Sequence, residues 1–167
     1  SLPDEFKELG NSLETLDLSA NNFTTIPSVL NKDNFPKLKS LNLTGNRRWT
    51  TNDLRKAGNY DDGLGFHFNV NNSNALRRLF LWDTLEELRL SNNYMEGQLP
   101  DFEVGKDGVE AYTQVDVDAF GGDTIQYLAD KRMPKILPKM KMLAINLNFF
   151  TGKIPDWILY HPYFLEW

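Results

Sequence analysis

The sequence predicts an α/β fold: a solenoid of stacked coils with a short parallel β-sheet on its concave face and loops, 3-10 turns and short helices on its convex face. Three observations lead to this prediction. An apolar pattern recurs with an asparagine in phase, an Ile/Leu-Pro tail recurs after it, and the chain has 167 residues without cysteine. This length suits one domain with a substantial core, so we assign residues 1–167 to a single domain.

The recurring pattern occupies four segments of the chain. They are LETLDLSANNF at 13–23, LKSLNLTGNRR at 38–48, LEELRLSNNYM at 85–95 and MKMLAINLNFF at 140–150. Each has apolar residues at positions 1, 4 and 6 and asparagine at position 9, which gives Asn21, Asn46, Asn93 and Asn148. Three segments continue into a tail, namely TTIP at 24–27, EGQLP at 96–100 and TGKIP at 151–155. Four copies with the asparagine in phase indicate an internal repeat.

Elementary physics gives each position of this repeat a role. The apolar residues at positions 4 and 6, such as Leu16 and Leu18, alternate as on a short strand and point into a core. The chain must then turn, and a buried asparagine can satisfy the turn's backbone groups because it offers two donors and an acceptor. One coil cannot bury its own apolar face, so the coils must stack. We therefore predict that Asn21 and its equivalents are structural and do not contact a ligand.

These segments resemble the leucine-rich repeat family, and the resemblance covers 1–50, 84–102 and 134–167. The tails NNYMEGQLP and NFFTGKIP resemble the variant found in plant receptors and some bacterial surface proteins. The family resemblance implies a right-handed superhelix that binds a partner on its concave face. The ending KIPDWILYHPYFLEW and the lack of cysteine caps resemble surface proteins of Bacteroides-type gut bacteria. That resemblance implies export to the exterior of the outer membrane, with a lipid anchor outside this chain as one option.

The residues between the core positions of each strand are expected to face the concave surface. They are short, polar and mixed in charge, so they do not form one electrostatic patch. The predicted binding residues are Thr15, Asp17, Ser19, Ser40, Asn42, Thr44, Glu87, Arg89, Ser91, Met142, Ala144 and Asn146. The predicted partner is a protein, with a glycan as the second option. The alternative is that these residues form an ordinary solvated sheet surface.

The repeat starts at 13, 38, 85 and 140 leave two gaps of about two coils each, so irregular or inserted segments are expected near 47–83 and 101–134. The first gap contains GFHFNVNN at 65–72, which places Phe66, Phe68 and Asn71 in the register of a cryptic repeat over 60–72. The alternative is an insertion followed by a helix at 73–88, SNALRRLFLWDTLEEL, that Ser73 or Asn74 caps. The second gap contains DTIQYLADKR at 123–132, which predicts a short helix.

Charge and composition exclude several function classes. The net charge of −5 argues against nucleic-acid binding, which depends on cationic contacts to phosphate. No apolar run approaches the roughly 18 residues of a transmembrane helix. His67 and His161 lack a zinc-like spacing and no catalytic motif is present, so we expect no enzymatic activity, cofactor or metal. We also expect the domain to be a monomer. For the acidic loop at 107–123, with Asp116 and Asp118, Ca²⁺ binding and a solvated loop both stay open.

Aromatic residues gather near the C-terminus: Trp157, Tyr160, Tyr163, Phe164 and Trp167. We expect this cluster to seal the last coil from water. The alternative is a platform on which sugar rings stack. Trp49 and Trp82 flank the first irregular segment and are expected to be packing residues. A glycan-binding module and a structural spacer in a larger surface protein therefore stay as alternatives to a protein-binding module.

Overall fold

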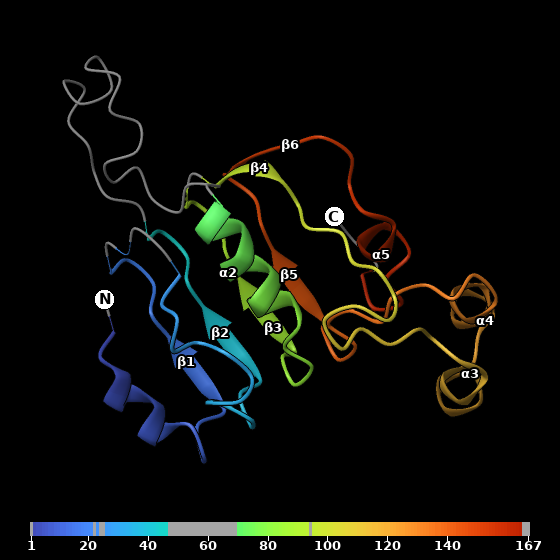
Figure 1. Ribbon diagram of the computed structural model, residues 1–167, viewed down its shortest axis with the longest axis horizontal. Coiled ribbons are helices and arrows are strands. Elements are labelled where there is room, and N and C mark those ends of the chain that lie inside the picture. The colour runs from blue at the N-terminus through green and yellow to red at the C-terminus, as the bar shows by residue number, and fades with distance from the viewer. Residues whose placement is uncertain (1, 22, 24–25, 47–69, 94, 165–167) are drawn as a thin grey trace.

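The computed structural model describes residues 2–21, 23, 26–46, 70–93 and 95–164. Its strands are short and its helices are few, in agreement with the predicted α/β solenoid (Figure 1). In chain order the elements are the 3-10 helix η1 (Asp4–Leu9), β1 (Thr15–Asp17), β2 (Ser40–Asn42), α2 (Val70–Phe80), β3 (Glu87–Arg89), β4 (Glu96–Gln98), α3 (Gln114–Phe120), α4 (Asp123–Asp130), β5 (Met142–Ala144), β6 (Phe149–Thr151) and α5 (Asp156–Leu159).

Four strands form one parallel sheet in the order β1-β2-β3-β5. Its register aligns Leu16, Leu41, Leu88 and Leu143, which are the residues at position 4 of the four repeats. Each repeat therefore supplies one strand, as the sequence pattern predicts. The parallel arrangement follows because every coil returns to the same side of the molecule before its next strand begins.

A second parallel sheet pairs β4 with β6, which lie side by side beyond one end of the main sheet (Figure 1). Its register aligns Gly97 with Phe150, both of which belong to the segments that follow the asparagine of the third and fourth repeats. This sheet was not predicted, because three-residue strands carry too little apolar alternation to be seen in the sequence.

The core joins the buried leucines of the main sheet to α2 and the loops, and it is best sealed in the two middle coils. Leu41 and Leu43 of the second coil, and Leu88 and Leu90 of the third, have no exposed surface. The equivalent Leu143 of the fourth coil is only partly buried. An inner coil is covered on both sides, whereas an end coil has a neighbouring strand on one side only.

The first irregular segment ends in α2, which lies on the core side of the sheet and buries Leu76 and Leu79 (Figure 1). Because β2 pairs directly with β3, the gap between the second and third repeats contributes no coil to the sheet, which favours the insertion. Asn71 lies within α2, and Phe66 and Phe68 lie outside the described residues.

The predicted helix at 73–88 is wrong at both ends. It begins earlier, at Val70, so Ser73 and Asn74 are inside the helix and not at its start. It ends at Phe80, and the Trp82 amide closes a turn by donating to the Leu79 carbonyl at 3.2 Å. The leucines that continue the helical spacing are instead needed as core residues of the β3 coil, so tertiary packing overrides the local helix preference.

The second irregular segment forms a helical hairpin, α3 and α4, that projects from the end of the solenoid beside β5 (Figure 1). Ile125 and Leu128 of α4 pack with Tyr112 in a small core of their own. The predicted helix at 123–132 is confirmed as α4, which ends two residues earlier, whereas α3 was not predicted. Among the described helices, none has both the length and the apolar character that a membrane span requires.

Asp116, which the sequence offered as a Ca²⁺ ligand, is used to hold this hairpin together. Its Oδ2 accepts a hydrogen bond from the Thr113 amide at 2.8 Å, and the two residues form a capping box at the start of α3. Its Oδ1 forms an ion pair with Lys135, which ties the hairpin to the chain after it. Within the described residues, no group of three acidic or histidine side chains is arranged to hold a metal ion.

The tryptophans are packing residues wherever the structure describes them. Trp82 has no exposed surface and lies 6.3 Å from Phe35 between ring centroids. Trp157 is 2% exposed, contacts Phe80 and Phe102 edge to face, and donates from Nε1 to the Pro100 carbonyl at 2.9 Å. Trp49 and Trp167 lie outside the described residues.

His161 is buried at the same end of the molecule and is held as a neutral ring. Its Nε2 lies 2.9 Å from the Leu137 carbonyl oxygen, and its Nδ1 accepts a hydrogen bond from the Tyr163 amide at 3.3 Å. This arrangement fixes the proton on Nε2. Burial lowers the pKa of His161 below its usual 6.5, because it disfavours the charged imidazolium.

We expect the stability of the protein to fall in acid partly through His161. Because the pKa of His161 is lower in the folded protein, the unfolded chain binds the proton more tightly. The contribution of the neutral ring to the free energy of unfolding is therefore complete above about pH 6.5 and is lost as the pH falls toward and through the folded pKa. Urea unfolding from pH 8 to pH 5 should show a steeper loss for the wild type than for His161→Gln. Both proteins keep His67, so the difference between them reports on His161; equal pH dependence would contradict this role.

Candidate interaction surface

The twelve predicted concave-face residues lie on one face of the main sheet in three rows, and we call this set the concave face. The first two rows are given by the strand register: Thr15, Ser40, Glu87 and Met142, then Asp17, Asn42, Arg89 and Ala144. The third row extends the same ladder, because the carbonyls of Thr44, Ser91 and Asn146 accept hydrogen bonds from the preceding coil. In β1, β2 and β3 the alternation of the strand turns these residues away from the buried leucine between them.

The second row begins with Asp17, a carboxylate that accepts hydrogen bonds from its neighbours. Asn42 Nδ2 donates to Asp17 Oδ2 at 3.3 Å, and the Ser19 amide donates to Asp17 Oδ1 at 2.9 Å. The hydrogen bonds from Ser19, more than the nearby charge of Arg89, lower the pKa of Asp17. Asp17 is therefore an anion held in a fixed orientation on an exposed surface.

The charges of the third coil lie next to this group. Arg89 approaches Glu87, with 3.9 Å between an Arg89 guanidinium nitrogen and Glu87 Oε2, and the Ser40 hydroxyl lies 3.5 Å from the same oxygen. Both charged side chains are about half exposed, at 47% and 46%. Such a pair is worth little to stability, so its charges stay available to a partner.

The concave face changes character at β5. Met142 and Ala144 place apolar groups beside Glu87 and Arg89, and the Ser91 hydroxyl donates to the Asn146 side-chain oxygen at 2.5 Å. The surface therefore combines two acids, one base, several neutral hydrogen-bonding groups and a small apolar margin. This combination suits recognition of a polypeptide surface better than attraction of one kind of ion.

The repeat asparagines lie behind this face and hold the turns after the strands. Asn46 and Asn93 have no exposed surface, and each donates from Nδ2 to two backbone carbonyls while its Oδ1 accepts an amide hydrogen bond from the preceding coil. Asn148 repeats the arrangement. The expectation that Asn21 is buried needs correction: its side chain is exposed and donates to the Ser19 carbonyl, because β1 is the edge strand of the sheet in the part of the chain that the structure describes.

Two family models match the chain. One, described as Leucine Rich repeats (2 copies), matches residues 11–56, and one described as Leucine Rich Repeat matches residues 84–102. The matched segments are leucine-rich repeats, and the parallel sheet of the structure gives the chain the fold of a leucine-rich repeat solenoid. No curated protein and no solved structure matches the chain significantly. Leucine-rich repeat domains are generally non-catalytic and are typically protein-interaction modules.

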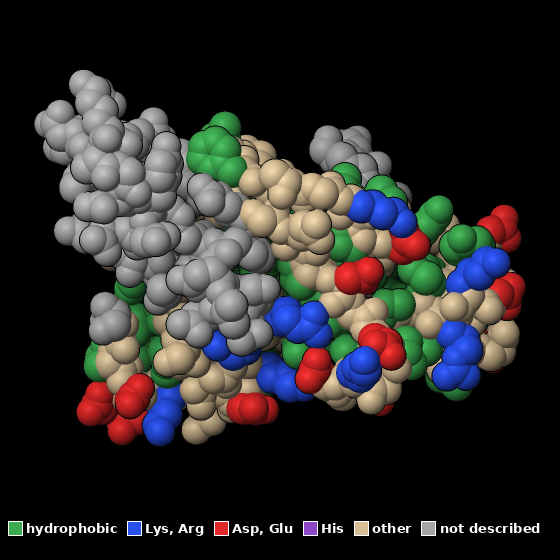
Figure 2. Space-filling view, turned by 45° about the horizontal axis from the view of Figure 1, so that its top comes forward, with side chains coloured by type: hydrophobic (Ala, Val, Ile, Leu, Met, Phe, Trp, Pro, Cys, Tyr) green, Lys and Arg blue, Asp and Glu red, His purple; other side chains and the backbone are tan. Residues whose placement is uncertain are grey.

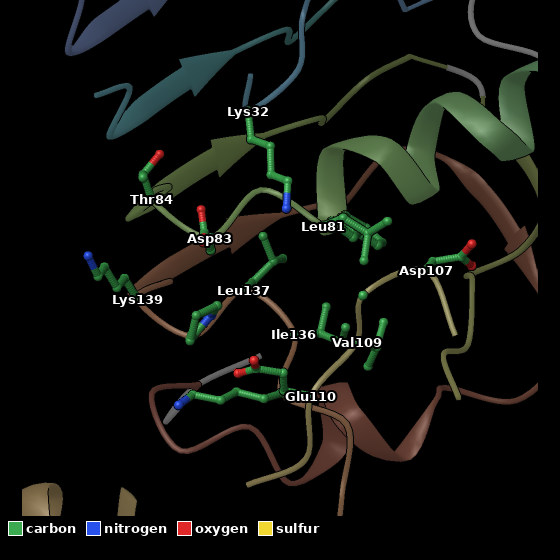
Figure 3. Close-up of a pocket in the computed structure, with 14 residues that line it drawn as sticks. Lys32, Leu81, Asp83, Thr84, Asp107, Val109, Glu110, Ile136, Leu137 and Lys139 are labelled. Atoms are coloured by element: carbon green, nitrogen blue, oxygen red, sulfur yellow. The ribbon is translucent and has the colours of Figure 1, made fainter. Parts of the chain in front are cut away.

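The leucine-rich repeat domain also has a recess that sequence reasoning missed, which we call the flank pocket. It has a volume of about 410 Å³ and lies where the chain enters β3 and β5 (Figure 3). Its walls come from Lys32, from the segment 80–84, from 107–110 and from 135–139. Four segments so far apart in the sequence share no motif, so no sequence signal could have grouped them.

Proposed function

We propose that this leucine-rich repeat domain is a non-catalytic interaction module that binds a protein partner through its concave face. The observation that supports it best is the row Asp17, Asn42, Arg89 and Ala144, in which an oriented anion, an amide, a cation and an apolar group follow one another on a rigid sheet. The backbone under this row is fixed by sheet hydrogen bonds, so binding requires little ordering of the surface.

The same residues specify the chemistry of the partner. Asp17 and Glu87 would bind basic or hydrogen-bond-donating groups of the partner. Arg89 would bind a carboxylate of the partner that lies between or beside those groups. A partner with one sign of charge alone would meet repulsion at one of these positions. We therefore expect a mixed polar protein surface with one apolar contact toward Met142 and Ala144.

We further propose that the protein is exported and acts on a bacterial cell surface. The support is the resemblance of its C-terminal segment, KIPDWILYHPYFLEW, to surface leucine-rich repeat proteins of Bacteroides-type bacteria, together with a cysteine-free sequence. Protease treatment of intact cells that express the native gene tests this: surface exposure predicts digestion before lysis, and protection until lysis would contradict it.

Charge reversal on the concave face should weaken the interaction. A photo-crosslinking amino acid at Asn42 identifies the partner, and calorimetry with the purified partner then measures affinity. We expect Asp17→Lys and Arg89→Glu each to lower affinity about tenfold or more, since each replaces an attraction by a repulsion. Lys106→Glu, on an exposed residue paired with Glu103 in the 101–112 segment, serves as the matched control and should leave affinity unchanged. Unchanged affinity in both concave variants would contradict the proposal.

The glycan-binding alternative loses Trp157 as a candidate, whereas Trp167 lies outside the described residues. Trp157 is buried in the core, so its ring is closed to a sugar. The more exposed rings at that end pack against one another: Tyr127 lies 5.2 Å from Tyr160, and Phe120 lies 6.5 Å from Tyr163. These pairs join the helical hairpin to the last coil. The spacer alternative is tested by the crosslinking experiment, because a pure spacer gives no concave-face partner.

A further inference from the structure

The flank pocket has an apolar floor inside a ring of polar and charged groups. Phe80, Val109, Ile136 and Leu137 form this floor as a packed layer, each at most 6% exposed, and the partly exposed Leu81 borders it. Figure 3 shows Lys32 on one side of the pocket and Glu110 on the opposite side, with Ile136 and Leu137 between them. A recess of this volume is within the range of pockets that bind small groups in proteins.

The two charges that face each other across this pocket have no ion-pair partner within the part of the chain that the structure describes. Most other charges of the lining are already used or point elsewhere: Asp107 pairs with Arg77 at 3.0 Å, and Lys135 pairs with Asp116. Lys139 points away from the centre of the pocket (Figure 3). Lys32 and Glu110 therefore remain as one cation and one anion on opposite sides of an apolar floor.

The distribution of charge restricts what can occupy the pocket. A simple anion would be repelled by Glu110 and the exposed rim residue Asp83, and a simple cation would be repelled by Lys32. On the part of the face in Figure 2 that the structure describes, Lys/Arg and Asp/Glu side chains are interspersed. The occupant that matches is apolar in its middle and carries opposite charges at its two sides.

We propose that the flank pocket binds an extended peptide segment of a partner protein, with an aliphatic side chain in the pocket, an acidic residue toward Lys32 and a basic residue toward Glu110. This site is separate from the concave face, since none of its lining residues belongs to the three rows. The segments that build it include the two irregular parts of the chain, so it is a feature that the regular coils do not supply.

Binding of a defined probe tests the proposal. The probe is a blocked pentapeptide of glutamate, glycine, leucine, glycine and lysine, and the readout is methyl NMR of Leu81, Val109, Ile136 and Leu137 in the full chain. We expect saturable shifts at these methyls, with affinity about tenfold lower when alanine replaces the probe's leucine. Glu110→Lys should bind this probe about fivefold more weakly and should prefer a probe with glutamate at both ends.

The variant Asp17→Lys is the control, because it changes the concave face and should leave the probe's affinity unchanged. Glu110 is exposed, and an unchanged melting temperature shows that Glu110→Lys is folded. Absence of methyl shifts, equal affinity for the leucine and alanine probes, or the same charge preference in wild type and Glu110→Lys would each overturn the proposal. Loss of probe binding in Asp17→Lys would also overturn it, since the two sites would then not be separate.

Discussion

Replacing Asn93 by alanine should lower the free energy of unfolding by about 4 kcal/mol, because several buried backbone groups lose their partners at once. Asn93 Nδ2 donates to the Leu43 carbonyl at 3.0 Å and to the Leu90 carbonyl at 2.8 Å, and its Oδ1 accepts the Asn46 amide at 2.7 Å. Asn93 itself has no exposed surface, so water cannot replace these bonds without opening the turn. Urea unfolding measures the change.

Asn21→Ala is the matched control for Asn93→Ala. The Asn21 side chain is exposed and donates to the Ser19 carbonyl at 3.0 Å, so its loss should cost less than about 0.5 kcal/mol. Asn93→Asp should cost at least as much as Asn93→Ala, since the buried carboxylate can accept from the Asn46 amide but loses its hydration and places an oxygen against the two carbonyls. Equal effects at positions 21 and 93 would show that burial of a repeat asparagine does not decide its contribution to the free energy of unfolding.

Replacing Gly10 by alanine should cost about 3 kcal/mol, because there is no space for a side chain at this position. An added Cβ would lie 1.6 Å from the Asn34 carbonyl oxygen and 2.9 Å from the Lys7 carbonyl oxygen, and both are backbone atoms that cannot rotate away. The backbone at Gly10 has an ordinary helical φ of −68°, so the cost comes from the clash and not from the conformation. Thermal and urea unfolding test this prediction.

Gly10→Ala should also detach η1 from the first coils. Phe6 of η1 packs on the buried Phe35, with 6.0 Å between ring centroids, and this contact depends on the close approach of Gly10 to Asn34. Hydrogen exchange should therefore become faster over η1. Gly105→Ala is the control: its φ of +90° strains alanine, yet no atom lies within 4 Å, so we expect about 1 kcal/mol. A larger effect at Gly105 than at Gly10 would contradict the steric argument.

The turns that three of the repeat asparagines hold also support the concave face; we call these asparagines, Asn46, Asn93 and Asn148, the asparagine ladder. Asn46 and Asn93 fix the turns that follow β2 and β3, and these turns begin next to Thr44 and Ser91 in the third row. A variant that loosens the ladder should therefore weaken partner binding through disorder of the face, even though no asparagine of the ladder touches the partner. Asp17→Lys should weaken binding with little loss of stability, so the two kinds of variant are distinguishable.

Several parts of this protein were decided by its sequence alone. The spacing of Leu38, Leu41 and Leu43 before Asn46 has one stable solution, a strand whose leucines are buried and whose asparagine satisfies the turn, and copies of it must stack. Because side chains alternate along a strand, the same spacing also determined which residues face outward, and all twelve predicted residues lie on one face. Local spacing was sufficient here because each rule acts within a few residues.

The remaining features depend on contacts between distant segments, which no local pattern encodes. The helix predicted at 73–88 stops at Phe80 because Leu85 and Leu88 are required in the next coil. Asp116, an apparent calcium ligand by composition, pairs with Lys135, a residue 19 positions away, and caps α3. Lys32 and Glu110 face each other only because four segments that are far apart in the sequence meet beside the start of β3 and β5. The repeat therefore specified the coils and their exposed face, whereas tertiary packing decided where the insertions lie and what surface they create.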